Sequence, residues 1–529
     1  MKFLIYITLF ISIQLSAQSY NWDWYQTIGS TGFDIISGIS IAIDKNNNIY
    51  YTGSTEDTAF TDAYLIDYNG SFSAFLIKYD ENGNYIWSKT FGGTSNENTY
   101  SITIDDNNNI FVTGRAAGLV TFDGINWESL TNCGQAYIVK FDENGNYLWH
   151  TIAESGNGEG NCLDIGSNNN IYYSGTTGAS VSTFENQPLI TGVSSSILAK
   201  YNDQNSFQWM KQIRSLYFPQ LIYDNNFIYL FGYGLLGYNI IYNTDTIIPD
   251  FDNQRFIFKF DNSGNLIWYK RTYGISNSAI SSNNNHFYIY GNFLDTIIFA
   301  PNDTLISAGS YNGFIASFDT SGNLEWAHVA ESNRSFINSI DFDSQNNIWI
   351  TGNYEQSLNI GQLNLIGSSD DRGLFFQINE NGTVNNNNYF EWIMPTCQIY
   401  KHIIRLDSYE NFIVNGIFTD CFEAGSFFEN TTGNYDLFLI KLSLVTENNK
   451  LEISNNNILY PNPANDFIRI SVDEEINNYT IYNLKGEVIE TNNKPCQNPV
   501  IDIQSFANGM YYIKFNTSKN SYTKKFVVL

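Results

Sequence analysis

Residues 39–53 read ISIAIDKNNNIYYTG, and residues 101–114 repeat the pattern as SITIDDNNNIFVTG. Each copy has an apolar run, an Asn-rich polar turn and a second apolar run that ends in Gly, which predicts two strands joined by a tight turn. Copies recur along the chain at steps of 57 to 64 residues, a period that indicates a repeat architecture. Their terminal glycines are Gly53, Gly114, Gly175, Gly232, Gly291, Gly352 and Gly416.

A second hairpin alternates with the first, and residues 75–87 read FLIKYDENGNYIW. Further copies occupy residues 137–149, 197–209, 256–268 and 314–326, and a stretched copy with an Asn-rich insertion occupies residues 374–392. The last copy, residues 437–441, stops before any turn or Trp, whereas residues 20–29 resemble only the strand after the turn. The resulting series of seven tryptophans is Trp24, Trp87, Trp149, Trp209, Trp268, Trp326 and Trp392.

A closed ring explains why one repeat is divided between the two ends of the repeat region. Four short strands in each repeat, arranged around an axis, predict an all-β fold: a seven-bladed β-propeller closed by the N-terminal strand, over residues 18–443. An unbroken ladder through the turn would place Ile77 opposite Trp87 and, in the last repeat, Ile440 opposite Trp24. The equivalent partners of the other tryptophans, Val139, Ala199, Phe258 and Ala316, are all apolar, which favours a structural role over sugar stacking.

The chain has 529 residues, a net charge of −27 and 16% aromatic residues, a composition typical of strands and turns. It has no cluster of Lys and Arg, so nucleic acid is not an expected partner. Residues 1–17 read as a signal peptide, with Lys2 ahead of the apolar run 3–13. That run is too short to span a bilayer and no later segment is long enough either, so no transmembrane segment is expected.

No catalytic constellation stands out, and we expect neither a cofactor nor a metal site. The five cysteines include no C-x-x-C pair, although Cys397 and Cys421 could form a disulfide outside the cell. The turn Asp80–Asn84 resembles the start of a calcium loop but lacks the downstream Glu of that motif. Asx-rich hairpin turns account for it without a metal. The four histidines, His150, His286, His328 and His402, occupy unrelated repeat positions.

A different kind of segment follows a predicted linker at residues 444–457. Residues 458–529 open with Leu459-Tyr-Pro-Asn-Pro463 and continue with several short alternating runs, such as residues 467–472 and 506–515. Short strands at this density favour a small C-terminal β-sandwich.

Both regions resemble known families. Residues 20–443 resemble the SBBP β-propeller repeats of secreted bacterial proteins. Residues 458–529 resemble the C-terminal sorting domain of the type IX secretion system (Por secretion system) of Bacteroidota. The positions that carry the second resemblance, and that we take as the sorting signal, are Tyr460, Pro461, Asn462, Pro463, Gly486, Gly509, Tyr511 and Lys525.

The second resemblance implies Sec-dependent export to the periplasm and then passage across the outer membrane by the type IX secretion machinery, the expected partner. It also implies removal of the sorting domain and a product that is released or attached to the cell surface.

The two hairpins of each repeat are separated by about twenty residues that vary between repeats, and connections of that length are usually functional. We therefore expect any specificity to reside in segments such as 56–71 and 115–135. The favoured function is a secreted or cell-surface binding protein, not an enzyme, whose ligand is a glycan or a protein. The alternative is a secreted polysaccharide-degrading enzyme that uses carboxylates on the propeller face.

Overall fold

The computed structural model describes residues 20–444 and 458–528, and the chain divides into two compact units, Met1–Leu444 and Val445–Leu529. The signal peptide and most of the linker predicted above lie outside the described residues. Short internal gaps in the description fall at residues 37, 61–64, 67–71, 94, 123–124, 129–133, 153–157, 181–182, 251, 301–302, 308–309, 394–397, 420, 425–426, 432–433, 461–466, 472–475, 484–487, 498, 508 and 518–520.

Antiparallel arrays of four strands make up the N-terminal unit, and each array combines the two hairpins of one sequence repeat. Near-continuous apolar runs, such as residues 75–77 and 110–112, bury the middle strands of the arrays on both faces. The first array contains β3 (Ile41–Ile43), β4 (Ile49–Thr55), β7 (Ser73–Tyr79) and β8 (Tyr85–Gly93), the second β9 (Asn98–Ile104), β10 (Ile110–Ala116), β13 (Gln135–Phe141) and β14 (Tyr147–Ile152), and the third β15 (Glu159–Ile165), β16 (Ile171–Thr177), β19 (Ser195–Tyr201) and β20 (Phe207–Arg214). The fourth contains β21 (Tyr217–Asp224), β22 (Phe227–Gly234), β25 (Gln254–Asp261) and the first part of β26 (Leu266–Asn283), and the fifth contains the rest of β26, β27 (His286–Ala300), β29 (Asn312–Asp319) and β30 (Leu324–Ala330). The sixth contains β31 (Ser335–Phe342), β32 (Ile348–Ile360), β33 (Leu363–Ile378) and β34 (Val384–Ile393), and the last contains β35 (Gln398–Leu406), β36 (Phe412–Thr419), β39 (Asp436–Leu444) and β1 (Tyr20–Ile28).

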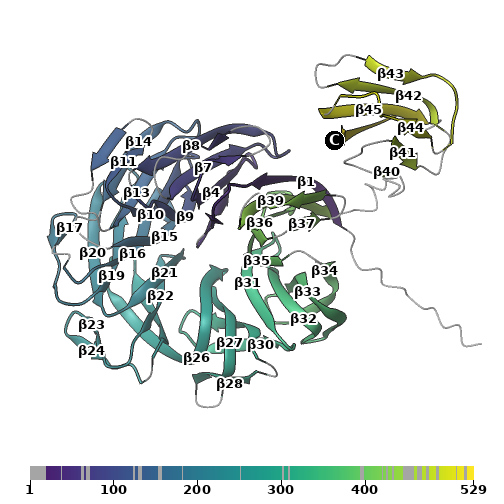
Figure 1. The fold of residues 1–529 in the computed structure, drawn as a ribbon. Coiled ribbons are helices and arrows are strands. Elements are labelled where there is room, and N and C mark those ends of the chain that lie inside the picture. The colour runs from purple at the N-terminus through teal and green to yellow at the C-terminus, as the bar shows by residue number, and fades with distance from the viewer. Residues whose placement is uncertain are drawn as a thin grey trace, which may run out of the picture. The chain divides into compact units, whose positions relative to one another are not determined.

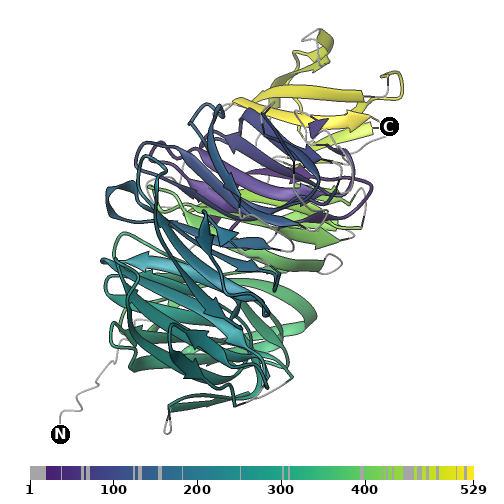
Figure 2. The same cartoon turned by 90° about the vertical axis from the view of Figure 1, so that its left-hand side faces the viewer.

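The arrays follow one another around a common centre, with strands such as β9, β21 and β31 innermost and β14, β20 and β34 at the rim (Figure 1). The N-terminal strand β1 is the fourth strand of the last array, because it pairs with β39 along its whole length. Figure 2 shows the same neighbourhood from the side, with the start of the chain in purple beside the green end of the unit.

The segments between the repeated hairpins add short strands. These are β2 (Asp34–Ile35), β5 (Ala59–Phe60), β6 (Leu65–Ile66), β11 (Leu119–Phe122), β12 (Ile125–Glu128), β17 (Thr183–Phe184), β18 (Gln187–Pro188), β23 (Ile240–Tyr242), β24 (Asp245–Ile247), β28 (Asp303–Ile306), β37 (Cys421–Ala424) and β38 (Phe427–Asn430). A 3-10 turn at Ser167–Asn169 is the helical element among the described residues. No helical segment of the described chain is long and apolar enough to cross a bilayer.

The expected partner of each repeated Trp is wrong by one residue. Tyr79 lies opposite Tyr85, but the register then shifts, so Trp87 lies opposite Lys78 and Ile77 faces Ser88. A β-bulge at Ile86 causes the shift, because two residues of one strand oppose one residue of its neighbour. The same shift sets Trp149, Trp209 and Trp268 opposite Lys140, Lys200 and Lys259, and Trp326 opposite Ser317.

One further register prediction needs correction for the same reason. Trp24 lies opposite Lys441, and Tyr25 takes the place opposite Ile440. Trp392 pairs with Gly373 instead of Gln377, the residue in the Lys position of that repeat. The Asn-rich insertion displaces it, and the amides of Asn385 and Asn388 donate to the Gln377 side chain instead.

The C-terminal unit has two antiparallel sheets that share one apolar core, which includes Ile470, Ile481, Tyr511 and Phe526. The smaller sheet contains β40 (Ile458–Tyr460), β41 (Phe467–Ser471) and β44 (Val500–Asp502). The larger sheet contains β43 (Val488–Asn492), β42 (Ile476–Asn483), β45 (Gly509–Thr517) and β46 (Ser521–Val528).

Candidate functional site

A cavity of about 1070 Å³ lies between the innermost strands of the N-terminal unit. Several residues of each innermost strand line it, and among them is the residue two positions before the turn that follows that strand. The residues at this position are Ala42, Thr103, Asp164, Ile222, Ser281, Asp341 and Arg405. The repeat therefore brings equivalent positions to one cavity, and the side chains differ from array to array.

The charged members of this set are held by the backbone of neighbouring strands. Asp164 accepts hydrogen bonds from the Tyr223 N–H at 2.7 Å and from the Ile165 N–H at 2.8 Å. Asp341 accepts one from the Leu406 N–H at 2.6 Å. Each carboxylate thus ties its own array to the next one, in addition to facing the cavity.

The cavity is electrostatically mixed. Burial raises the pKa of Asp164 to about 6, against the lowering effect of its backbone hydrogen bonds. Burial also raises the pKa of Asp341, and the Arg405 guanidinium acts on it in the opposite direction. Arg405 donates to the Ile404 carbonyl at 2.8 Å and also lines the cavity. Arg334 is a further lining residue, so the cavity lining carries two carboxylates and two guanidinium groups.

Sequence reasoning did not identify Asp164, Asp341 or Arg405. A signal for them exists in the alignment of the repeats, where a charged residue replaces a small or apolar residue at one fixed position. Only the ring of strands shows that this position faces the cavity.

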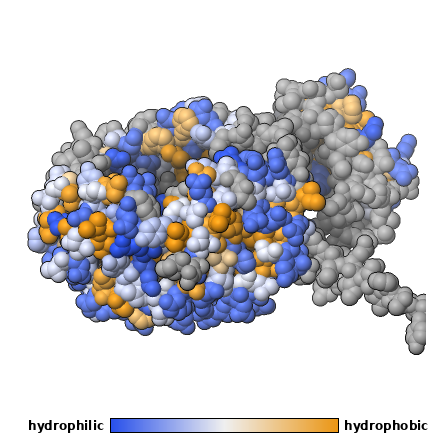
Figure 3. All heavy atoms as spheres, turned by 90° about the horizontal axis from the view of Figure 1, so that it is seen from below, coloured by the Kyte–Doolittle hydropathy of each residue, from blue (hydrophilic) through white to orange (hydrophobic). Residues whose placement is uncertain are grey.

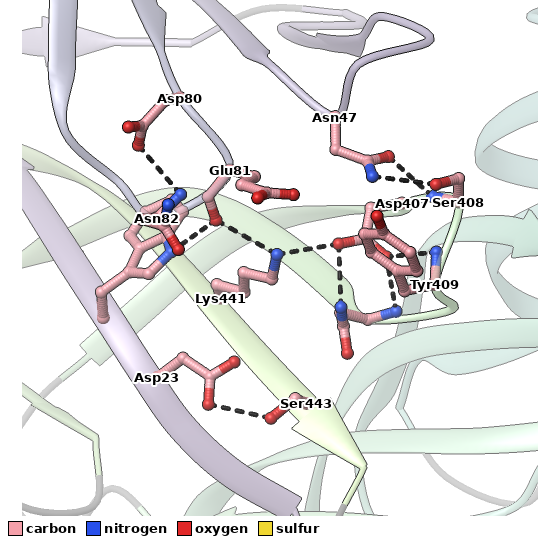
Figure 4. Close-up of polar contacts among 12 residues, drawn as sticks. Asp23, Asn47, Asp80, Glu81, Asn82, Asp407, Ser408, Tyr409, Lys441 and Ser443 are labelled. Carbon is pink, nitrogen blue, oxygen red and sulfur yellow. Dashed lines mark hydrogen bonds and ion pairs between the residues drawn. The ribbon is translucent and has the colours of Figure 1, made fainter.

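A polar contact between a Lys of one array and a turn of the next array recurs in the unit, and Figure 4 shows it where the first and last repeats meet. The Lys441 ammonium forms an ion pair with Asp407 at 2.8 Å, and both side chains are buried. The same ammonium donates to the Glu81 carbonyl at 3.1 Å, and the Trp24 indole N–H donates to that carbonyl at 3.2 Å.

An internal boundary has the same three contacts. Lys78 lies 4.0 Å from Asp44 and donates to the Glu143 carbonyl at 3.0 Å. The indole N–H of Trp87 donates to that carbonyl at 3.3 Å. The repeated Trp is therefore packed against the turn of the next array, which supports its structural role although its predicted partner was wrong.

The Asx-rich turns have an internal explanation. In the turn Asp80–Asn84, one Asp80 oxygen accepts from the N–H groups of Asn82 and Asn84, and the other accepts from the Asn84 side-chain amide. In the turns that open each array, Asn47, Asn108 and Asn346 adopt positive φ, which Asn tolerates well. Among the described residues, no three His, Cys, Asp or Glu side chains are grouped so as to hold a metal ion.

The histidines and cysteines do not form a common site among the described residues. His402 is buried beside the Asn338 amide, and burial lowers its pKa to about 4. His286 lies between Glu325 and Glu380, while His328 contacts the Gly382 carbonyl. Cys162 is a free, buried thiol. The proposed partner Cys397 lies outside the described residues, as does the side chain of Cys421.

Part of the predicted sorting signal lies on the described strands of the C-terminal unit. Tyr511 is buried, its hydroxyl donates to the Ala507 carbonyl at 2.8 Å, and its ring stacks on Phe526. Gly509 has a φ of +150°, a conformation that residues with side chains rarely adopt. Tyr460 is the last residue of β40 and Lys525 lies on β46, whereas Pro461, Asn462, Pro463 and Gly486 lie outside the described residues.

Comparison with known proteins supports both parts of the chain. Residues 458–529 match the family described as secretion system C-terminal sorting domain, and residues 23–60 and 86–118 match the β-propeller repeat. A curated relative, an uncharacterized WD repeat-containing protein of Acanthamoeba polyphaga mimivirus, is 27% identical over 380 residues. The match covers 63% of this chain but only 26% of the relative, so the chain spans about a quarter of that protein.

Solved structures give weaker matches. A protein of unknown function from Dyadobacter fermentans is 10% identical with a TM-score of 0.35, and the match covers 66% of this chain and 95% of that chain. An endosialidase of phage phi92 is 10% identical with a TM-score of 0.36, covering 96% and 87%. The NanB sialidase of Streptococcus pneumoniae is 9% identical with a TM-score of 0.35, covering 80% and 70%. TM-scores this low support no inference about activity.

The sorting domain directs a protein to the type IX secretion machinery, and it accounts for the second unit of the chain. Residues 458–529 are thus a secretion-system C-terminal sorting domain that follows an all-β unit built from β-propeller repeats, and the protein is secreted or attached to the cell surface.

Proposed function

We propose that the N-terminal unit is a closed seven-bladed β-propeller that acts outside the cell as a binding protein for a glycan or a protein. The observation that carries the proposal is the cavity at the centre of the arrays, where Asp164, Asp341 and Arg405 interrupt a ring of otherwise uncharged positions. A rigid scaffold with a few non-repeated polar groups in a cavity is typical of a ligand site. The variable segments 56–71 and 115–135 would add contacts.

Ligand binding can be tested with the secreted protein on a glycan array and by cross-linking on intact cells. Exchange of the variable segment 115–135 for 56–71, and separately the substitution Arg405→Met, should each weaken binding of a captured ligand. Binding that survives both changes would place the ligand elsewhere on the protein.

Ring closure is supported by the lysine contact where the first and last repeats meet, which matches that at an internal boundary. Deletion of residues 20–29 should therefore destabilise the whole unit, because it exposes the edges of two arrays. A single cooperative unfolding transition at lower urea is the expected result. Fraying confined to the last repeat, with the other repeats equally protected from hydrogen exchange, would contradict closure.

Export should end with loss of the sorting domain, with residues 1–17 removed and the signal carried by Tyr460, Pro461, Asn462, Pro463, Gly486, Gly509, Tyr511 and Lys525. Intact-mass analysis of protein collected from the cell surface and the medium is the test. A mature chain that retains Leu529 would contradict processing.

A polysaccharide-degrading enzyme is the second candidate, and one observation favours it. Asp164 and Asp341 face the same cavity, and burial raises the pKa of both. A carboxyl with a raised pKa can serve as a general acid beside a second carboxylate. Turnover of a polysaccharide that is lost in both Asp164→Asn and Asp341→Asn would establish this function.

A further inference from the structure

A stack of three aromatic side chains, with Phe218 exposed and Tyr217 and Tyr233 half-buried, lies where the third array joins the fourth. We call it the pile. Tyr217 and Tyr233 are paired across β21 and β22, and their rings stack with centroids 5.6 Å apart. The ring of Phe218 stacks on Tyr233 at 5.8 Å with an interplanar angle of 17°. Arg255, opposite Tyr233 on β25, places its guanidinium 5.0 Å from the centre of the Tyr233 ring.

Phe218 is unusual in both exposure and backbone conformation. Its side chain is 55% exposed, and its φ is +47°. Among the described residues with positive φ other than Gly, most are Asn and Phe218 is the sole aromatic one. A bulky residue in this region is strained, and such strain tends to persist where a function requires the side chain. Because the Phe218 ring is mostly exposed, its burial does not stabilise the fold enough to offset this backbone strain.

Exposed apolar side chains and carboxylates follow β22 in the chain. Leu236 and Tyr238, in the loop that follows β22, are 54% and 52% exposed. Burial raises the pKa of Tyr217, and Tyr238 and Tyr233 add to the increase. Asp252 accepts the Leu236 N–H with one carboxylate oxygen at 2.8 Å. Asp250 is also exposed and accepts from Arg271 and Tyr273.

We propose that Phe218, Tyr233 and Tyr217 form a stacking platform for the pyranose rings of a neutral polysaccharide. This inference rests on the proposed binding function and names a ligand class and a site for it. A sugar ring has an apolar C–H face that matches an aromatic ring, and a rim of hydroxyls that can donate to the Asp252 carboxylate.

Charge distinguishes a neutral polymer from an acidic one. The Asp250 carboxylate is ion-paired with Arg271 at 3.0 Å, so the local charges largely balance, and the net charge of −27 is what would repel an anionic chain. On the side of the N-terminal unit that Figure 3 shows, apolar side chains occur in small groups among hydrophilic ones.

Native-gel affinity electrophoresis of the secreted protein tests the proposal. The gels contain laminarin, hydroxyethyl cellulose, xylan or galactomannan as neutral probes, and alginate as the anionic probe. We expect at least one neutral polymer to retard the protein and alginate not to. The substitution Phe218→Asn should weaken that binding about tenfold or more, since one aromatic stack is lost.

Asn suits the positive φ of position 218, so Phe218→Asn should leave the thermal unfolding midpoint unchanged or raise it. Phe218→Tyr keeps the aromatic ring and should bind like the wild type. The matched control is Tyr409→Asn, which removes a 69% exposed aromatic residue from the turn Asp407–Asn411 and should leave binding unchanged.

Undiminished binding by Phe218→Asn would overturn the site while leaving the binding function in place. Failure of every neutral polymer to retard the protein, or retardation by alginate alone, would overturn the ligand class, and the proposed function would then rest on a protein ligand. A drop in the unfolding midpoint of Phe218→Asn that Phe218→Tyr reverses, without any change in binding, would show a structural role instead.

Discussion

Trp24 lies opposite Lys441 on neighbouring antiparallel strands, although these residues stand at the two ends of the repeat region. Both donate to the same carbonyl oxygen, that of Glu81 in the first repeat. One pair of side chains thus joins three segments: the N-terminal strand, the last strand of the unit and the turn Asp80–Asn84. Since all ten tryptophans precede residue 393, tryptophan fluorescence reports unfolding of this unit alone.

Replacement of Lys441 should destabilise the N-terminal unit. Lys441→Met leaves the buried Asp407 carboxylate without its ion-pair partner and should lower the free energy of unfolding by about 3 kcal/mol. Lys45→Met is the matched control, since the Lys45–Asp106 pair is exposed and its loss should cost less than about 1 kcal/mol. Urea unfolding followed by tryptophan fluorescence measures both. Equal losses of unfolding free energy in the two variants would show that the buried Lys441–Asp407 pair stabilises the unit no more than an exposed pair does.

Gly83 should be sensitive to a single methyl group. Its φ is +79°, and a Cβ atom there would lie 2.5 Å from the indole of Trp24. Gly83→Ala therefore combines backbone strain with a clash and should destabilise the unit by about 2 to 3 kcal/mol. Gly192 also has positive φ but has no atom within 4 Å of the added Cβ, so Gly192→Ala should cost only about 1 kcal/mol. A comparison of the urea midpoints separates the clash from the strain.

His402 should make the unit sensitive to acid. Burial lowers its pKa from 6.5 to about 4, so the unfolded chain binds a proton in this range that the folded chain does not. Stability is complete above pH 6.5 and falls as the pH drops, by about 3 kcal/mol at pH 4. His402→Gln removes the titration, so the difference in unfolding free energy between wild type and variant should change with pH only below 6.5. A difference that stays constant from pH 4 to 8 would contradict this assignment.

Asp34 should change the stability of the unit with pH in the direction opposite to His402. Burial raises its pKa from 3.8 to about 8, with Asp436 and Asp57 adding to the increase and hydrogen bonds from Ser30 opposing it. The folded chain therefore keeps a proton that the unfolded chain loses. Stability from this group is complete below pH 3.8 and falls, by as much as about 1.4 kcal/mol per pH unit, until pH 8.

Asp34→Asn tests this directly. The variant should match the wild type near pH 4, where both side chains are neutral, and should be the more stable protein at pH 8. Urea midpoints at pH 7 and 8 are decisive, because His402 contributes no slope there. A variant that is less stable than the wild type at pH 8 would show that the Asp34 carboxylate is favourable in the folded state.

The amino-acid sequence by itself determined the all-β class, the repeat and the sorting domain. The spacing of Gly53, Gly114 and their equivalents indicates one four-stranded unit, because each glycine lies in the second strand of its array. The division of one repeat between residues 20–29 and 437–441 also predicted which strands pair. The tail motif around Tyr460 and Gly509 identified the export route, since it is a local pattern that needs no distant partner.

The tertiary structure alone decided the register and the candidate sites. The bulge at Ile86 depends on how two strands and the next array pack together. It places Trp87 opposite Lys78 instead of opposite Ile77, the predicted partner. Asp164, Asp341 and Arg405 are far apart in the chain and meet only because the arrays surround one cavity. Likewise, no local pattern shows that Phe218 is exposed at positive φ. Such contacts arise between arrays, where distance along the chain carries no information about distance in space.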